Sequence, residues 1–439
     1  MGAVGRAKAR ARLLVSVLLT CAHASGRRRW TQHREAAAVA AHKFARAVHD
    51  AAQARLPTQA EGCPCADSSL CLPIAGSPLA EREIFGFIGG NGSTIDWSRV
   101  TTVAWAAPDD YALMCRAHAM GARVILSAPK PELVLTSNST ARAEWVSTAV
   151  AAVTASYHDG IVFDWESPCR VGSPMQYWYG VLIGETRAAL RSVHAGYQVS
   201  TCVAWSPDNI DGRGYNVGAF SRSSDALYVM DYDTRSQVID ACIAGANAPF
   251  GGTVRGISRF LDLGVPASQL ILGVPWYGYR YPCLEGTTPD ARFCPIKEVP
   301  FRGVNCSDAA GSEVGYKEIL VRLRTMNATT NPSWDSNQGA PYFNSLETIQ
   351  ERSSETLDHS GRASPTGTAI GVVQYWYDDA QSLAPKYAYA RSVGLRGVGP
   401  YTFTDVDSKD DVMYKALDSF LLPHAGERVP LAKAKESEA

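Results

Sequence analysis

Short apolar runs alternate with longer amphipathic stretches from residue 83 onward. Apolar runs bounded by turn residues predict buried strands, whereas apolar residues that recur at helical spacing predict amphipathic helices. We therefore expect strands near residues 83–89, 101–106, 122–128, 160–166, 198–205, 226–232, 270–276 and 394–402. The clearest expected helices are Thr140–Tyr157 and Met175–His194. Repeated strand–helix units indicate an α/β fold with a parallel sheet, and eight strands suggest a (β/α)8 TIM barrel.

The gap between the seventh and eighth expected strands is too long for a single helix. Residues 278–370 contain three cysteines, two sequons and many Gly, Pro and Asn residues, so we expect an insertion domain with a small core of its own. Residues 61–277 would then supply the first seven strands, and residues 371–424 would complete the barrel with strand eight.

Charge and hydropathy limit the possible partners. The chain has 42 Lys and Arg residues against 43 Asp and Glu residues, and this net charge of -1 argues against a nucleic-acid partner held by bulk electrostatics. No internal apolar run is long enough to span a bilayer, so we expect no membrane partner.

The N-terminus has the pattern of a secretory signal over residues 1–24. Basic residues precede the apolar run Leu13–Leu19, and the small residues that a signal peptidase prefers follow at 22–24. A mitochondrial transit peptide is the alternative, because residues 27–55 are rich in arginine. Residues 25–60 are expected to be a leader or disordered linker, and residues 425–439 a C-terminal tail.

Ten cysteines remain after the expected signal is removed. An even number suits a disulfide framework in an oxidising compartment, although the pairing is open at this stage. Zinc binding is the rival interpretation of Cys63-Pro64-Cys65, but a C-x-C pair without a second pair at the usual spacing is a poor zinc motif. Four sequons, at Asn91, Asn138, Asn305 and Asn327, would accept glycans in the secretory pathway.

The fourth expected strand ends in the acidic stretch D-G-I-V-F-D-W-E-S, residues 159–167. Alternate residues of a strand share a face, so Val162, Asp164 and Glu166 should point into the barrel and Trp165 towards the helices. Two coupled carboxyls can share a proton, which keeps a carboxylic acid available to protonate a glycosidic oxygen. The alternative is a strand end whose acids meet solvent or arginines.

This stretch resembles the D-G-x-D-x-D-x-E signature of the family 18 glycoside hydrolases. The resemblance is to a lysosomal group of that family and extends from Cys63 to about Leu421. It is carried by the ordered stretches 63–71, 97–104, 113–126, 203–211, 229–233, 242–249, 273–279 and 299–311. It implies a TIM barrel whose insertion domain is an α+β unit that walls the cleft.

The resemblance also implies a mechanism in which the substrate assists its own cleavage. Glu166 would be the general acid, Asp164 would orient the N–H of the substrate's 2-acetamido group, and Tyr232 would bind its carbonyl oxygen. That oxygen attacks the anomeric carbon, and an oxazolinium ion forms. The mechanism needs no cofactor and no metal. Further substrate contacts are expected from Asp233, Asp159, Trp276, Tyr277, Trp376 and Tyr401, with core packing as the alternative for the aromatic residues.

Two residues depart from the family pattern. Val162 stands where most members have an aspartate that hydrogen-bonds the residue equivalent to Asp164, so one partner of that carboxyl is missing. Tyr401 stands where the family usually has a tryptophan beneath the sugar, so stacking should be weaker. Both changes would weaken an enzyme or suit a sugar-binding relative.

The resemblance predicts a retaining exo-hydrolase of β-1,4-linked N-acetylglucosamine. It would act from the reducing end on the chitobiose core of asparagine-linked glycans and on chitooligosaccharides, as a lysosomal or secreted monomer. The alternatives are a chitooligosaccharide-binding lectin on the same barrel and an endo-acting chitinase. Family lectins typically lose the catalytic glutamate, and Glu166 is present.

Overall fold

The computed structural model describes residues 62–74, 82–89, 92–325, 332–357, 363–406 and 411–421. The expected signal peptide, the leader up to residue 60, the tail from residue 425 and the sequons at Asn91 and Asn327 lie outside these residues. Asn138 and Asn305 are described, and both are exposed, as a glycan acceptor must be.

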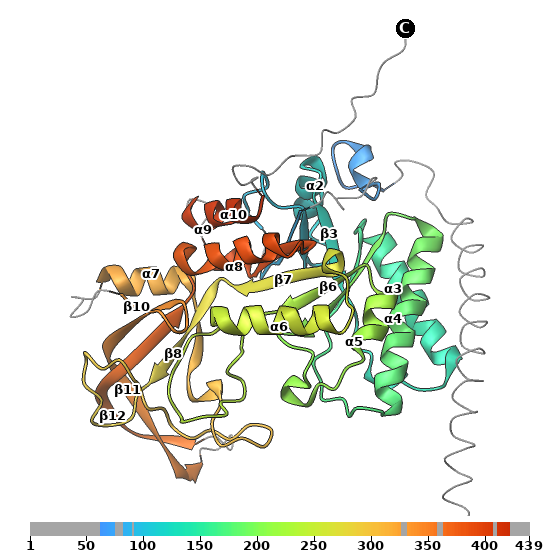
Figure 1. The fold of residues 1–439 in the computed structure, drawn as a ribbon. Coiled ribbons are helices and arrows are strands. Elements are labelled where there is room, and N and C mark those ends of the chain that lie inside the picture. Colours follow the sequence, from blue (N-terminus) through green and yellow to red (C-terminus); the bar gives the residue numbers. More distant parts are fainter. Residues whose placement is uncertain are drawn as a thin grey trace, which may run out of the picture.

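Eight parallel strands close into a barrel, so the predicted TIM fold is confirmed (Figure 1). Each predicted barrel strand is present, and most end one to three residues earlier than expected. Neighbours around the barrel follow the order β1-β13-β7-β6-β5-β4-β3-β2. The strands are β1 (Glu83–Phe87), β2 (Thr102–Ala104), β3 (Arg123–Ser127), β4 (Gly160–Phe163), β5 (Gln198–Ala204), β6 (Ala226–Met230), β7 (Leu270–Pro275) and β13 (Gly397–Tyr401).

Helices surround the barrel, and their starts follow from local capping. Asn138 accepts hydrogen bonds from the first turn of α3 (Ser139–Ala155), and Ser173 caps α4 (Pro174–Val193), whose first residue is the proline favoured there. These two helices are the ones predicted most clearly from the sequence. The others are α2 (Tyr111–Ala119), α5 (Val217–Ser223), α6 (Phe250–Asp262), α8 (Ala380–Ser392), α9 (Asp411–Ala416) and α10 (Asp418–Leu421).

Two apolar layers result from the alternation of side chains along the strands. The helix-facing layer lies between the barrel and its helices and includes Ile161 and Phe163 of β4. The barrel interior holds the intervening residue Val162, together with Phe85 of β1 and Ile271 of β7. The parity of a residue on its strand therefore decides whether its side chain can reach the mouth of the barrel.

The insertion between β7 and β13 is built on a five-stranded antiparallel sheet, which lies beside the barrel (Figure 1). Its order is β10-β11-β12-β8-β9, and its helix is α7 (Tyr316–Thr325). The sheet ends at Tyr377, beyond the expected boundary at residue 370. The strands are β8 (Tyr277–Pro282), β9 (Ser312–Gly315), β10 (Ser333–Asp335), β11 (Ala340–Leu357) and β12 (Ala363–Tyr377).

Eight of the ten cysteines form four disulfides: Cys63–Cys71, Cys65–Cys115, Cys242–Cys306 and Cys283–Cys294. The zinc interpretation of Cys63 and Cys65 is wrong, since both sulfurs are used in disulfides and zinc binds thiolates. Cys169 and Cys202 are buried and free. None of the described helices combines the length and apolar character that a membrane span requires.

Candidate active site

The two candidate catalytic carboxylates follow directly from β4. This strand begins at Gly160, where φ is +153° and a Cβ atom would lie 1.9 Å from the carbonyl oxygen of Gln198. Only glycine lets β4 approach β5 so closely. The strand ends at Phe163, so Asp164 and Glu166 lie at its carboxyl end, the face on which TIM barrels build their active sites.

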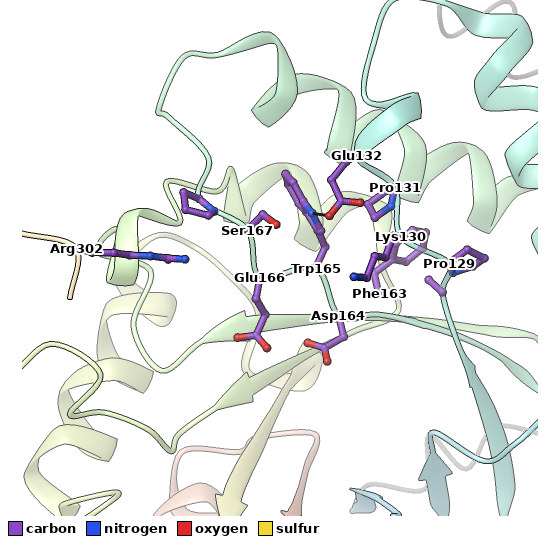
Figure 2. A pocket seen from close by; sticks show the side chains of 12 residues that line it. Pro129, Lys130, Pro131, Glu132, Phe163, Asp164, Trp165, Glu166, Ser167 and Arg302 are labelled. Atoms are coloured by element: carbon purple, nitrogen blue, oxygen red, sulfur yellow. Dashed lines mark hydrogen bonds between the residues drawn. The ribbon is translucent and has the colours of Figure 1, made fainter. Parts of the chain in front are cut away.

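Asp164 and Glu166 point to the same side, as strand parity predicts (Figure 2). Trp165 lies between them in sequence and turns the other way, where its Nε1 donates to Oε1 of Glu132 at 2.7 Å and its ring stacks on Tyr215. Both carboxylates line one pocket with the loop 128–132 that follows β3. The sequence prediction that these two acids share a face is confirmed.

The Asp164 carboxyl is largely buried and incompletely hydrogen-bonded. Its Oδ1 atom is inaccessible to solvent and has no hydrogen-bond partner. Burial and the nearby charge of Glu166 raise the pKa of Asp164 to about 7, although the Cys202 thiol and Arg213 act in the opposite direction. The carboxyl lines the pocket, and its raised pKa brings its proton exchange towards neutral pH.

Glu166 lies at the rim, with 53% of its side chain exposed, in an ion pair with Arg213. Arg213 is itself held by Asp211, whose Oδ2 lies 2.9 Å from Nη2 of the arginine. The alternative expectation, that the acids at this strand end pair with arginines, is therefore confirmed for Glu166. Because the pair is partly exposed, a glycosidic oxygen that enters the mouth can compete with Arg213 for this carboxyl at small cost.

Asp233 follows β6 and is fixed from three sides. Its backbone N–H donates to Oδ1 of Asn247 at 2.6 Å, and its Oδ1 accepts from the hydroxyls of Tyr277 at 2.5 Å and Tyr279 at 3.1 Å. Burial raises the pKa of Asp233, and the two tyrosine hydrogen bonds offset part of that rise. Asp233 and Tyr277, both predicted to contact substrate, are therefore joined directly.

Aromatic rings crowd the mouth around Tyr401. The ring of Tyr232 stacks on Tyr401 with centroids 5.2 Å apart, and Tyr277 meets it edge-on at 5.9 Å. Trp105 also meets Tyr401 edge-on, at 5.6 Å, and its buried Nε1 has no hydrogen-bond partner. Sequence reasoning missed Trp105, although its place at the end of the second expected strand marks it as a mouth residue.

Two carboxyls of the insertion, those of Asp308 and Glu313, lie near Asp233. Burial, followed by the charges of Asp233 and Asp211, raises the pKa of Asp308 to about 7. Burial and the charge of Asp233 likewise raise the pKa of Glu313 on β9. The insertion thus contributes polar groups next to Asp233, which the sequence did not identify. This placement agrees with an insertion that walls the cleft.

The structure contradicts the prediction that Asp159 binds substrate. Asp159 precedes β4 and therefore lies at the end of the barrel opposite the mouth, only 1% exposed. Its Oδ2 accepts from Nε2 of His118 and from the Val124 N–H, both at 2.8 Å, and its Oδ1 accepts from the Ile74 N–H at 2.8 Å. All of these partners are structural.

Trp276 and Trp376 also fail as stacking platforms, because they are 0% and 2% exposed. Trp276 has the outward parity of β7, packs edge-on against Tyr414 at 5.1 Å and donates from Nε1 to the Tyr387 hydroxyl at 3.1 Å. Trp376 stacks on Tyr342 within the insertion, with centroids 4.8 Å apart. Both tryptophans are therefore packed in the core, which was the alternative prediction for the aromatic residues.

The pattern that defines Glycosyl hydrolases family 18 matches residues 131–405 of this chain. The di-N-acetylchitobiase of Mus musculus is 38% identical over 353 residues, which cover 80% of this chain and 89% of the mouse protein. The di-N-acetylchitobiase of Homo sapiens is 36% identical over 355 residues, which cover 80% of this chain and 85% of the human protein.

A solved structure has the same architecture. The crystal structure of the family 18 chitinase from Cycas revoluta in complex with (GlcNAc)3 gives a TM-score of 0.59 at 18% sequence identity. The match covers 77% of this chain and 99% of that chain. At this identity the likeness establishes the fold alone, and the shared fold is the barrel described above.

Proposed function

We propose a specific activity for this chain, which belongs to Glycosyl hydrolases family 18. The chain removes N-acetylglucosamine from the reducing end of its substrates, which are β-1,4-linked chitooligosaccharides and the chitobiose core of N-glycans. Membership of the family and similarity to di-N-acetylchitobiases make it a glycoside hydrolase of chitin or chitobiose linkages. The exo mode, the reducing-end specificity and the role in glycoprotein catabolism are the finer parts of the proposal.

The observation that carries the mechanism is that Asp164 and Glu166 line one pocket at the barrel mouth. A carboxyl that lines a pocket can accept a hydrogen bond from a donor that arrives with the ligand. The N–H of a 2-acetamido group is such a donor. When it binds Asp164, the acetamido carbonyl oxygen is left free to attack the anomeric carbon.

Glu166 and Tyr232 assist the remaining steps of the reaction. As the bond from the anomeric carbon to the glycosidic oxygen breaks, Glu166 gives its proton to that oxygen, and an oxazolinium ion forms. Tyr232, which follows β6, would donate its hydroxyl hydrogen to the acetamido carbonyl oxygen. Water then opens the oxazolinium ion as Glu166 takes a proton back, so the product keeps the β configuration.

An acidic compartment suits the electrostatics of the protein. Burial raises the pKa of Asp164 and Asp308 to about 7 and that of Asp231 to about 6. Each of these groups binds its proton more tightly in the folded state, so the folded protein gains stability as the pH falls. Four disulfides and exposed sequons also suit the secretory route. These observations support the lysosome as the proposed location.

The test is hydrolysis of chitotriose labelled at its reducing end, from acidic to neutral pH, with Glu166→Gln as the control. The proposal expects labelled monosaccharide as the first product and no release by the control. Labelled disaccharide as the first product would indicate endo action instead. Binding of chitotriose without turnover would overturn the enzyme in favour of the lectin, with Val162 and Tyr401 as the first residues to revert.

A further inference from the structure

The loop that follows β5, residues 205–216, lies against the stretch of chain that carries Glu166. The Tyr215 hydroxyl is 2.6 Å from the carbonyl oxygen of Trp165 and 2.8 Å from that of Ser167. These two residues flank Glu166 in the sequence. The loop therefore holds the backbone on both sides of the candidate general acid.

Arg213, two residues before Tyr215, reaches the side chain of Glu166. Its Nη1 is ion-paired with Oε2 of Glu166, and its Nη2 donates to Oδ2 of Asp211 at 2.9 Å. The side chains of Arg213 and Asp211 are only 9% and 8% exposed, so the arginine is held on its buried side. Because a guanidinium is a rigid, planar fork, an anchor on one nitrogen fixes the direction in which the other points.

The Asp211 carboxylate is in turn anchored from the loop that follows β6. Its Oδ1 accepts a hydrogen bond from the Ser236 hydroxyl at 2.7 Å, and the backbone N–H of Asp211 donates to Oε1 of Gln237 at 3.2 Å. An exposed ion pair alone would hold Glu166 only weakly. Here the partner of Glu166 is the end of a hydrogen-bonded chain that links the loops after three consecutive barrel strands.

Other charged and titratable groups also lie around Glu166. They come from β5, from the loops after β3, β4, β5 and β6, and from the insertion: Lys130, Glu132, Asp164, Cys202, Arg213, Tyr215, Asp233 and Arg302. Arg302 donates to the carbonyl oxygen of Asp211 and so adds to the anchor. Among the described residues, Arg213 is the one that is ion-paired with the Glu166 carboxyl.

We propose that Arg213 is a positioning residue, which holds the Glu166 carboxylate at the mouth between the two proton transfers of the reaction. Glu166 is ionised once the glycosidic oxygen has taken its proton. Water oxygen then bonds to the anomeric carbon, the bond from that carbon to the acetamido oxygen breaks, and Glu166 takes a proton from the water. This inference rests on the proposed function, because it concerns the second of these steps. Arg213 acts through Glu166.

The test compares Arg213→Met, which removes the charge and the donors, with Arg213→Lys, which keeps the charge but cannot bridge two carboxylates as a fork does. Arg213→Met is expected to lower kcat for chitotriose about tenfold, the rate equivalent of one hydrogen bond to a charged group, with little change in KM. The alkaline limb of its pH profile should move to higher pH, because a carboxyl that loses a neighbouring cation holds its proton more tightly. Arg213→Lys should lower kcat less and keep the native profile.

Arg259→Met is the matched control, because Arg259 pairs with another carboxylate of the same loop. Its Nη2 lies 3.0 Å from Oδ1 of Asp208. This variant should leave kcat and the pH profile unchanged. An unchanged kcat in Arg213→Met, or a lower kcat with an unmoved alkaline limb, would overturn the positioning role. If Arg213→Met does not fold, Arg213→Lys carries the test, and a kcat equal to that of the native chain would then overturn the role.

A second readout separates this inference from the proposed function. The titration of the Glu166 carboxyl, followed by 13C NMR, requires no turnover. Its midpoint should move to higher pH in Arg213→Met and stay at the native value in Arg213→Lys and Arg259→Met. If the native chain binds chitotriose without cleaving it, the proposed function fails, while a moved midpoint still supports the hold of Arg213 on the carboxylate. An active native enzyme with an unmoved midpoint in Arg213→Met would overturn the inference alone.

Discussion

The two ends of β4 carry aspartates with opposite surroundings. At the start of the strand, both oxygens of Asp159 accept hydrogen bonds, from one side chain and two backbone N–H groups. At its end, Oδ1 of Asp164 is buried without a partner. A carboxylate with every oxygen bonded away from a pocket is part of the framework, whereas one that lines a pocket is available to a ligand. Burial alone does not separate the two roles.

Trp276 and Trp105 also differ in their surroundings. Trp276 has its ring enclosed in the helix-facing layer and its Nε1 bonded to Tyr387. Trp105 is partly exposed at the mouth, and its Nε1 has no partner. Both follow the end of a barrel strand, so position along the chain does not distinguish them. The exposure of the ring does, and a substitution at Trp276 tests whether it is a reliable guide.

The largest effect is expected at Asp164. Asp164→Asn should lower kcat/KM for chitotriose about 1,000-fold, because an amide cannot ionise to stabilise the oxazolinium ion as it develops. The thermal unfolding midpoint should stay at or above that of the native chain. Steady-state kinetics and calorimetry check both parts, and a large fall in stability would place Asp164 with Asp159 as a framework residue.

Asp159→Asn should show the reverse behaviour. Removing the charge from a buried, paired carboxylate that accepts three hydrogen bonds costs about 3–5 kcal/mol of the free energy of unfolding. The kcat measured per folded molecule should be unchanged. Urea unfolding and active-site titration test this, and a loss of kcat in a fully folded variant would restore Asp159 as a substrate-binding residue.

The dependence of stability on pH should report the burial of Asp164. The folded-state pKa of Asp164 is about 7 against an ordinary value of 3.8, so the folded protein holds this proton where the unfolded chain releases it. The free energy of unfolding should therefore fall as the pH rises from about 4 to about 7, by ~2 kcal/mol from this group after allowance for partial exposure.

In Asp164→Asn that part of the fall should be absent, because the amide does not titrate. Urea titrations at several pH values compare the slopes for the native chain and the variant. Identical slopes would show that Asp164 has an ordinary pKa and that the barrel does not desolvate it.

The smallest effect is expected from two aromatic residues, Tyr401 at the mouth and Trp276 in the helix-facing layer. Tyr401→Ala should raise KM about fivefold, the equivalent of ~1 kcal/mol of lost ring contact with the sugar. Trp276→Phe should leave KM unchanged and lower the unfolding midpoint, because its ring only packs. Kinetics and thermal unfolding of the two variants separate these roles, and a raised KM in Trp276→Phe would contradict the assignment.

Much of the fold was predictable because β strands have a two-residue period. The eight barrel strands, and the shared face of Asp164 and Glu166, follow from local pattern alone. The same parity could have excluded Trp276, which follows Val274 on the outward face of β7. It could also have excluded Asp159, which shares the outward parity of Ile161 and Phe163 and precedes the strand, at the end opposite the mouth.

The remaining site residues depend on contacts between segments that lie far apart in the sequence. Arg213 reaches Glu166 only because the loop after β5 folds over β4, and Asp308 approaches Asp233 only through the packing of the insertion. The disulfide pairing was likewise open, because an even cysteine count allows many connectivities.

The most direct test of the account is the configuration of the new reducing end, followed by 1H NMR during the first minutes of chitotriose hydrolysis. If Asp164 aligns the substrate's own acetamido group as the nucleophile, the anomeric centre is inverted twice and the β-anomer appears first, before mutarotation. Appearance of the α-anomer first would mean direct attack by water, and would contradict the role assigned to Asp164.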